Sequence, residues 1–150
     1  MAVKLTKQQE TAVKSRGGKL LVSAAAGSGK TKVLVDRLIS YLLDPHEPSN
    51  IDDFLIITYT KAAASELRCK ISAKLTEYLA ESPGNRHIQR QLQRLYLTKI
   101  STVHAFCADI IREYVYELDV APDFRVADEN ECLELQMQVL DQLMENKYEQ

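Results

Sequence analysis

The sequence predicts an α/β fold in which helices flank a parallel sheet. Three apolar runs, residues 20–22, 54–58 and 97–102, have the length of short strands. Each is followed by a run with helical periodicity, so strands and helices alternate along the chain. The second run is apolar without a break, which suits a parallel sheet covered on both faces. The 150 residues suffice for one domain with a core.

The first element that we expect is a short helix over residues 5–13. Thr6 can cap its N-terminus, and Gln9 stands three residues later, as in a capping box. The alternative is that Gln9 hydrogen-bonds the edge of an adenine base. The sequence leaves these two roles equally open, and one side chain serves only one of them well.

The most informative segment follows the first expected strand and precedes a helix expected over residues 30–43: Ala24, Ala25, Ala26, Gly27, Ser28, Gly29, Lys30 and Thr31. It matches a phosphate-binding loop, with Ala24 in place of the first glycine. Gly27 and Gly29 allow the backbone to turn its N–H groups toward a phosphate, and the helix N-terminus adds its positive dipole end. We expect Lys30 on the β- and γ-phosphates and the hydroxyl of Thr31 on Mg²⁺. A Gly-Ser turn beside a chance lysine is the weaker interpretation.

Polar and aromatic residues follow the second expected strand, before a helix expected over residues 62–79: Thr58, Tyr59, Thr60 and Lys61. Open α/β sheets bind ligands beyond the carboxyl ends of their strands, so these residues are candidate ligand contacts. The third strand ends at Thr102, and His104 begins the next helix. His104 has no Cys or second His at ligand spacing, which disfavours zinc. A histidine at the edge of the core and a polar group at the ligand edge both remain open.

Two further helices differ in charge. A helix from Arg86 carries Arg86, Arg90 and Arg94 on one face, which we interpret as solvated, with contact to phosphates as the alternative. A final amphipathic helix follows Asp128. Residues 1–112 hold 17 Lys and Arg against 10 Asp and Glu, whereas residues 113–150 hold 2 against 11. This change of sign predicts a boundary near residue 120 and permits a polyanionic partner for the first part only.

Composition bounds the cellular setting. No apolar run approaches the ~20 residues of a membrane span, and the N-terminus lacks the apolar stretch of a signal peptide. The three cysteines are far apart and form no C-x-x-C pair, which is typical of reduced thiols. We therefore expect a cytoplasmic protein without a membrane partner.

Nucleotide hydrolysis needs more than a phosphate loop. An acidic pair after a later strand should hold Mg²⁺ and orient the attacking water. No apolar run here ends in Asp-Glu, and Asp52 and Asp53 precede a strand instead. We therefore expect either a fragment of a longer chain or a binding module. The helical pattern, which has no stop signal before Gln150, favours the fragment.

Several segments together resemble superfamily 1 DNA helicases of the UvrD/Rep type. Residues 5–13, with Gln9, resemble the Q motif, and residues 24–31 resemble the first motif, which tolerates Ala24. Residues 58–67 resemble motif Ia, although Tyr59 stands where phenylalanine is more frequent in the family. Residues 101–107 resemble motif Ib, although relatives often have an aromatic residue at the position of Val103. Three stretches are most similar to the AddA (RexA) family of helicase–nuclease subunits: residues 24–26, 100–107 and 124–129.

The resemblance implies a fold and a set of site residues. Residues 1–120 would form part of a RecA-like P-loop motor domain, 1A, and residues 121–150 the start of a helical domain, 1B. ATP and Mg²⁺ would be the cofactors, with Gln9 on adenine, the loop of residues 24–31 around the phosphates and Arg37 near the nucleotide. The residues alone favour the other interpretation of Arg37, a surface charge paired with a carboxylate. The track for single-stranded DNA would be lined by Thr58, Tyr59, Thr60, Thr102 and His104. An aromatic face stacks on any base, and hydroxyls bind phosphates without reading sequence.

The resemblance also implies an activity. The full-length protein would be an ATP-dependent DNA helicase and exonuclease acting on single-stranded and duplex DNA in double-strand-break repair. It would work with a second subunit of the AddB/RexB type at the bacterial nucleoid, and the isolated fragment would be inactive. The alternatives are a UvrD/Rep-type repair helicase without nuclease, an unrelated P-loop module such as a kinase or switch, and a helical interaction module using residues 133–144.

Overall fold

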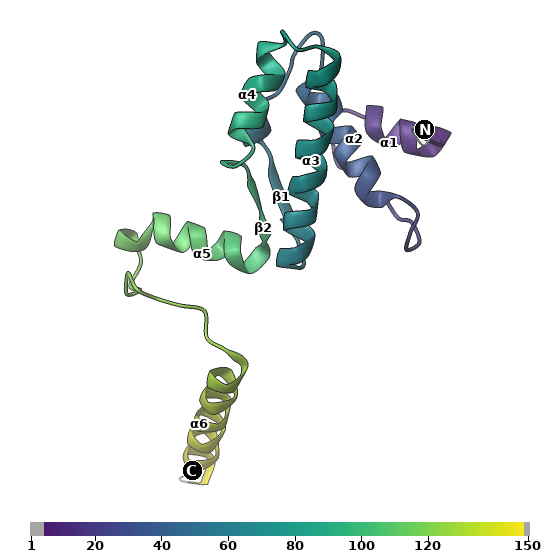
Figure 1. Cartoon of the computed structure of the whole chain (residues 1–150). Helices are drawn as coiled ribbons and strands as arrows, with labels where there is room; N and C mark the ends of the chain where they lie inside the picture. The colour runs from purple at the N-terminus through teal and green to yellow at the C-terminus, as the bar shows by residue number, and fades with distance from the viewer. Residues whose placement is uncertain (1–4, 149–150) are drawn as a thin grey trace. The chain divides into compact units, whose positions relative to one another are not determined.

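The computed structural model describes residues 5–148 (Figure 1). The chain divides into two compact units, Met1–Phe106 and Cys107–Gln150. The elements in chain order are α1 (Lys7–Lys14), α2 (Lys30–Leu42), η1 (Ile51–Asp53), β1 (Leu55–Thr58), α3 (Lys61–Glu81), α4 (Arg86–Arg94), β2 (Lys99–Thr102), α5 (Val103–Glu113), η2 (Val115–Glu117) and α6 (Glu129–Tyr148). Among these helices, none is both long enough and apolar enough to cross a bilayer.

The sheet of the first unit consists of two parallel strands. β1 pairs with β2 in a register that sets Leu55 opposite Lys99 and Thr58 opposite Thr102. Parallel neighbours need a crossover, which α3 and α4 supply, and α3 packs on both strands. The predicted α/β class and the parallel pairing are confirmed. The two strands therefore end side by side.

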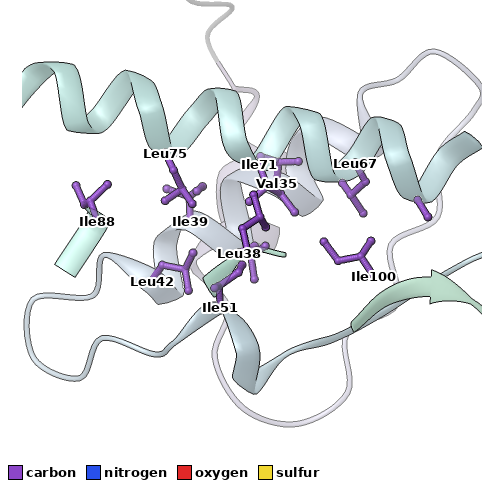
Figure 2. Packing of buried hydrophobic residues seen from close by; sticks show 12 residues of the cluster. Val35, Leu38, Ile39, Leu42, Ile51, Leu67, Ile71, Leu75, Ile88 and Ile100 are labelled. Carbon is purple, nitrogen blue, oxygen red and sulfur yellow. The ribbon is translucent and has the colours of Figure 1, made fainter. Parts of the chain in front are cut away.

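The core of the first unit lies between α2, α3 and the sheet (Figure 2). Both helices present apolar residues at intervals of three and four, which places those residues on one face. The buried cluster contains Val35, Leu38, Ile39, Leu42, Ile51, Ala64, Leu67, Ile71, Leu75, Ile88, Leu95 and Ile100. Each fully buried Leu or Ile stabilises the fold by roughly 1.5–3 kcal/mol relative to an exposed one.

Polar side chains tie the connecting segments to this core. Gln91 of α4 is fully buried; its Oε1 accepts a bond from the N–H of Ile51 at 2.7 Å, and its Nε2 donates to Asn50 Oδ1 at 3.1 Å. Arg68 of α3 donates to the carbonyls of Leu95 and Thr98. The two Arg68 bonds hold the turn before β2. Residues 97 and 98 belong to that turn, so β2 begins at Lys99, two residues later than predicted.

Two predictions about the sheet are wrong. Residues 20–22 do not form a strand: Leu20, Leu21 and Val22 are 44%, 92% and 43% exposed. A strand persists when its backbone pairs with a neighbour, and within residues 5–148 this run has no ladder partner. β1 is also not covered on both faces, because Leu55 and Ile57 are exposed on the face opposite the buried Ile100 layer.

The second unit contains α6, whose N-terminus is capped as predicted. Asp128 Oδ1 accepts from the N–H of Glu131 at 3.0 Å, and Glu131 Oε2 accepts from the N–H of Asp128 at 3.0 Å. Arg125 Nη1 donates to the same carboxylate at 2.7 Å. Arg125 and the Asp128 N–H lower the pKa of Glu131 to about 2. This pair of reciprocal bonds is a capping box, and it sets where α6 begins.

Candidate functional site

The phosphate loop joins an exposed segment to the N-terminus of α2. Gly27 and Gly29 have φ angles of +74° and +84°, in the left-handed region that disfavours residues with a Cβ. The expected left-handed backbone at these two glycines is therefore confirmed, and their use in binding a phosphate stays a prediction. Residues 21–28 are all exposed, and within the loop the N–H of Ser28 donates to the carbonyl of Ala25 at 3.3 Å.

The first turn of α2 is suited to an anion. Its N-cap, Gly29, has no side chain to cap the helix, and the turn contains no acidic residue. The leading N–H groups of a helix lack intrahelical acceptors and carry the positive end of the dipole. The Lys30 ammonium donates to the carbonyls of Ala24 at 2.6 Å and Ala25 at 2.8 Å. One lysine charge is thus held against the loop, and the Thr31 side chain beside it is exposed.

Gln9 connects α1 to the loop. Its Oε1 accepts from the N–H of Thr6 at 2.9 Å, and Thr6 Oγ1 accepts from the N–H of Gln9 at 3.3 Å, so the predicted capping box is confirmed. Its Nε2 donates to the carbonyl of Ser28 at 3.1 Å. A Cβ placed on Gly29 would lie 3.5 Å from that nitrogen. The two ends of this amide therefore serve two segments, and its predicted contact with adenine stays a prediction.

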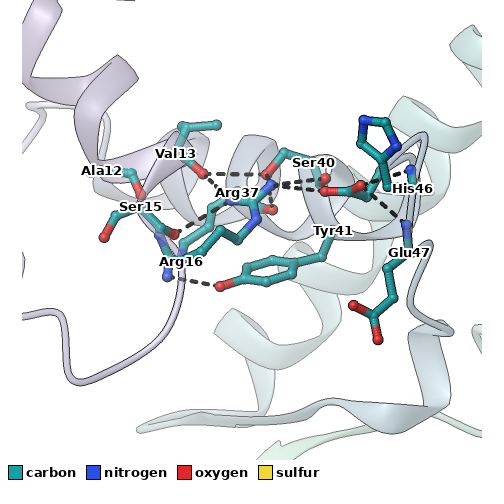
Figure 3. A network of polar contacts seen from close by, with 10 residues as sticks. Ala12, Val13, Ser15, Arg16, Arg37, Ser40, Tyr41, His46 and Glu47 are labelled. Carbon is teal, nitrogen blue, oxygen red and sulfur yellow. Dashed lines mark hydrogen bonds and ion pairs between the residues drawn. The ribbon is translucent and has the colours of Figure 1, made fainter.

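Arg37 lies two turns into α2, and its described partners are protein groups (Figure 3). Nη1 donates to the carbonyl of Ala12 in α1, and Nη2 donates to the hydroxyl of Tyr41 at 3.1 Å. The expectation that Arg37 lies near a nucleotide stays a prediction.

The carboxyl ends of β1 and β2 bring the other candidates together. Thr58 and Thr102 are register partners, and Tyr59 is fully exposed. Thr60 Oγ1 caps α3 by accepting from the N–H of Ala63 at 3.1 Å, and Thr102 Oγ1 accepts from the N–H of Ala105 at 3.2 Å at the start of α5. Thr58 donates to the carbonyl of Thr60 at 3.0 Å, and His104 is exposed in the first turn of α5.

The loop and the strand ends lie toward the same end of the first unit. α2 and α3 pack against each other and run side by side in the same direction (Figure 1). Because α2 begins at the phosphate loop and α3 begins just after β1, both starting points face the same way.

Sequence reasoning missed the polar contacts that fix α1 to α2. Arg16 Nη1 donates to the carbonyl of Val13 at 2.9 Å, and its Nη2 donates to Ser40 Oγ at 3.0 Å (Figure 3). Backbone N–H groups of His46 and Glu47, and more weakly Arg16, lower the pKa of Asp44. No spacing rule links Arg16 to Ser40, since 24 residues separate them.

A family model and individual relatives assign this chain to the same kind of protein. Residues 5–150 match the model of the family described as UvrD/REP helicase N-terminal domain. Proteins named as ATP-dependent helicase/nuclease subunits of the A type are similar to this chain: 48% identity in Oceanobacillus iheyensis over 97% of this chain, and 47% in Desulforamulus reducens over 98%. A third, from Clostridium acetobutylicum, is 45% identical over 95% of this chain. The chain spans only 11–12% of the length of these relatives.

Proposed function

Because this chain belongs to the family of UvrD/REP helicase N-terminal domains, we propose that it is the ATP- and single-stranded-DNA-binding part of an ATP-dependent DNA helicase. The observation that supports this most is the glycine loop, with Lys30 on its carbonyls, at an uncapped helix start. We infer that the two strands belong to a RecA-like P-loop domain, 1A, over residues 1–120, and that residues 121–150 begin domain 1B.

The nucleotide chemistry follows from the loop. A triphosphate would accept hydrogen bonds from the loop N–H groups and draw the Lys30 ammonium away from the Ala24 and Ala25 carbonyls. The Thr31 hydroxyl is an exposed oxygen donor beside that lysine, which fits the preference of Mg²⁺ for oxygen ligands shared with substrate phosphates. When bound, Mg²⁺ would neutralise charge on the phosphates.

The strand ends suit a single strand of DNA. The exposed ring of Tyr59 offers a face on which any base can stack. The cap made by Thr60 uses only an acceptor lone pair, so the hydroxyl proton of this exposed residue remains available to a phosphate oxygen. Thr102 makes the same kind of cap but is only 9% exposed, so its hydroxyl is less accessible to DNA than that of Thr60. Thr58 and His104 would complete a track that does not read sequence.

The relatives extend the proposal to the longer protein. Since they are named as subunits of an ATP-dependent helicase/nuclease, we infer that the longer protein has an exonuclease outside this chain and a second subunit of the AddB/RexB type. We further infer that it acts in double-strand-break repair, in the bacterial cytoplasm at the nucleoid. A repair helicase without nuclease is the alternative, and it shares every site residue proposed here. The family match disfavours an unrelated P-loop kinase or switch.

The test is ATP hydrolysis by the full-length protein with and without single-stranded DNA. Lys30→Ala should lower DNA-stimulated turnover by roughly 10²-fold or more, because a charge on the transferring phosphates is lost. Lys70→Ala is the matched control, since that exposed lysine pairs with Glu66 on α3. Normal turnover by Lys30→Ala would refute the proposed loop chemistry.

A further inference from the structure

Helix α1 is too short to hold its own position. It has eight residues, and isolated helices below about 12–15 residues are marginal in water. Val13 is its only buried residue among those described. The place of α1, and of the Gln9 that it carries, therefore depends on contacts from other elements.

The C-terminal end of α1 is held by two arginines. Helix-terminal carbonyls lack intrahelical donors, and here Ala12 accepts from Arg37 while Val13 accepts from Arg16 at 2.9 Å. Ser40 Oγ also lies 3.3 Å from the Val13 carbonyl, although its one proton makes the shorter bond, 2.6 Å, to the Arg37 carbonyl. Positive charge at a helix C-terminus is favoured by the dipole as well as by the hydrogen bonds.

Tyr41 fixes both guanidinium groups to α2. The Cζ of Arg16 lies 4.1 Å from the centroid of the Tyr41 ring, and that of Arg37 lies 5.3 Å away (Figure 3). Arg37 donates to the Tyr41 hydroxyl, and Arg16 donates to the Ser40 carbonyl at 3.1 Å. Together, Arg16, Arg37, Ser40 and Tyr41 form an arginine clamp.

The opposite end of α1 reaches the phosphate loop. Gln9 lies in the first helical turn and donates to the Ser28 carbonyl at 3.1 Å. One short helix is thus attached to the loop at its start and to the clamp at its end. The contacts at the C-terminal end of α1 therefore bear on where Gln9 lies against the loop.

We propose that Arg37 is a positioning residue, which acts on nucleotide binding through α1 and Gln9 and makes no contact with the phosphates. This deepens the proposed function and rests on it, because it adds a contact between Gln9 and the adenine base of a nucleotide held at the loop. Gln9 would bind the base with the second Nε2 proton and the second Oε1 lone pair, which its bonds to Ser28 and Thr6 leave unused. All nucleoside triphosphates share the phosphates, whereas the donors and acceptors on the base edge differ between adenine and guanine. Loss of the clamp should therefore weaken ATP binding selectively.

The test compares KM for ATP and for GTP in DNA-stimulated turnover by the full-length protein. Arg37→Ala and Gln9→Ala should each raise KM for ATP roughly tenfold, as expected for the loss of one charge-assisted or base-reading hydrogen bond. Both variants should leave KM for GTP, and kcat, within about twofold of the unsubstituted protein. The double variant should be no worse than either single one. Arg90→Ala, which removes an exposed arginine of α4, should change neither KM.

Circular dichroism establishes whether each variant folds. If Arg37→Ala unfolds, Arg37→Lys carries the test: it retains the charge but cannot bond Ala12 and Tyr41 together, so it should show the same ATP-selective rise, smaller in size. An equal rise in both KM values would overturn the inference, because it would mean direct phosphate contact.

The Gln9 variant separates this inference from the proposal beneath it. A selective effect of Gln9→Ala with none from either Arg37 variant overturns the inference alone. No selective effect of Gln9→Ala removes the adenine role and the inference together. Normal turnover by Lys30→Ala overturns the proposed function itself.

Discussion

Replacement of Tyr59 by alanine should weaken single-stranded DNA binding while leaving the fold intact. Tyr59 follows β1 directly, and its side chain is fully exposed. Its ring therefore buries no surface that the folded chain needs. Under the proposed function, the same ring stacks on a base when DNA lies across the strand ends.

The exposure sets both magnitudes. Surface substitutions away from buried contacts change the free energy of unfolding by less than about 0.5 kcal/mol. Stacking of one base on an aromatic ring contributes ~1–3 kcal/mol, so the dissociation constant for single-stranded DNA should rise about 5- to 150-fold. KM for ATP should stay within about twofold, because Tyr59 is absent from the proposed nucleotide contacts.

Fluorescence anisotropy of a labelled oligothymidylate at fixed salt measures the dissociation constant of the full-length protein. Tyr96→Ala is the matched control, because Tyr96 is 75% exposed but lies before β2, at the amino-terminal end of the sheet. An unchanged dissociation constant for Tyr59→Ala, or an equal loss for Tyr96→Ala, would refute the proposed track.

Two further predictions concern single residues of the 150-residue chain. Gln91→Ala should lower the free energy of unfolding in urea by about 1–3 kcal/mol, because the N–H of the fully buried Ile51 loses its acceptor. The control, Gln93→Ala on the exposed face of the same helix, should lower it by less than about 0.5 kcal/mol. An equal loss in both variants would count against the Gln91 bond. The pKa of Glu131 is lowered from its ordinary value of 4.5 to about 2. The capping bonds of its carboxylate therefore stabilise α6 fully at pH values above 4.5, and this stabilisation is lost as the pH falls through about 2. Carboxyl NMR should give a midpoint near 2 that rises in Arg125→Gln, and an ordinary midpoint in the unsubstituted chain would contradict the Arg125 contact.

The threonines at the strand ends show how structural and binding roles can share one side chain. The resemblance to superfamily 1 helicases predicts that Thr60 and Thr102 contact DNA. In the structure, both threonines cap helices. A cap holds the hydroxyl oxygen in a fixed place, which leaves its proton pointing away from the helix N–H. Capping therefore does not compete with phosphate binding by the exposed Thr60, whereas Thr102 is buried and its cap role is the one that the structure supports.

The sequence alone determined the local structure. The capping box of Thr6 with Gln9, the left-handed Gly27 and Gly29, and the starts of α2 and α4 all depend on residues within about four positions of each other. Such interactions are readable from spacing. The α/β class followed for the same reason, since the period of apolar residues separates helices from strands.

The tertiary structure alone decided what distant residues do. Arg37 bonds a carbonyl 25 positions away, and Gln91 accepts from an N–H 40 positions away. Residues 20–22 have the composition of a strand but lie exposed, because a strand also needs a neighbouring backbone. Spacing in the sequence carries no information about which distant groups will meet. Those partners are set only when the helices pack and the strands of the sheet take their register.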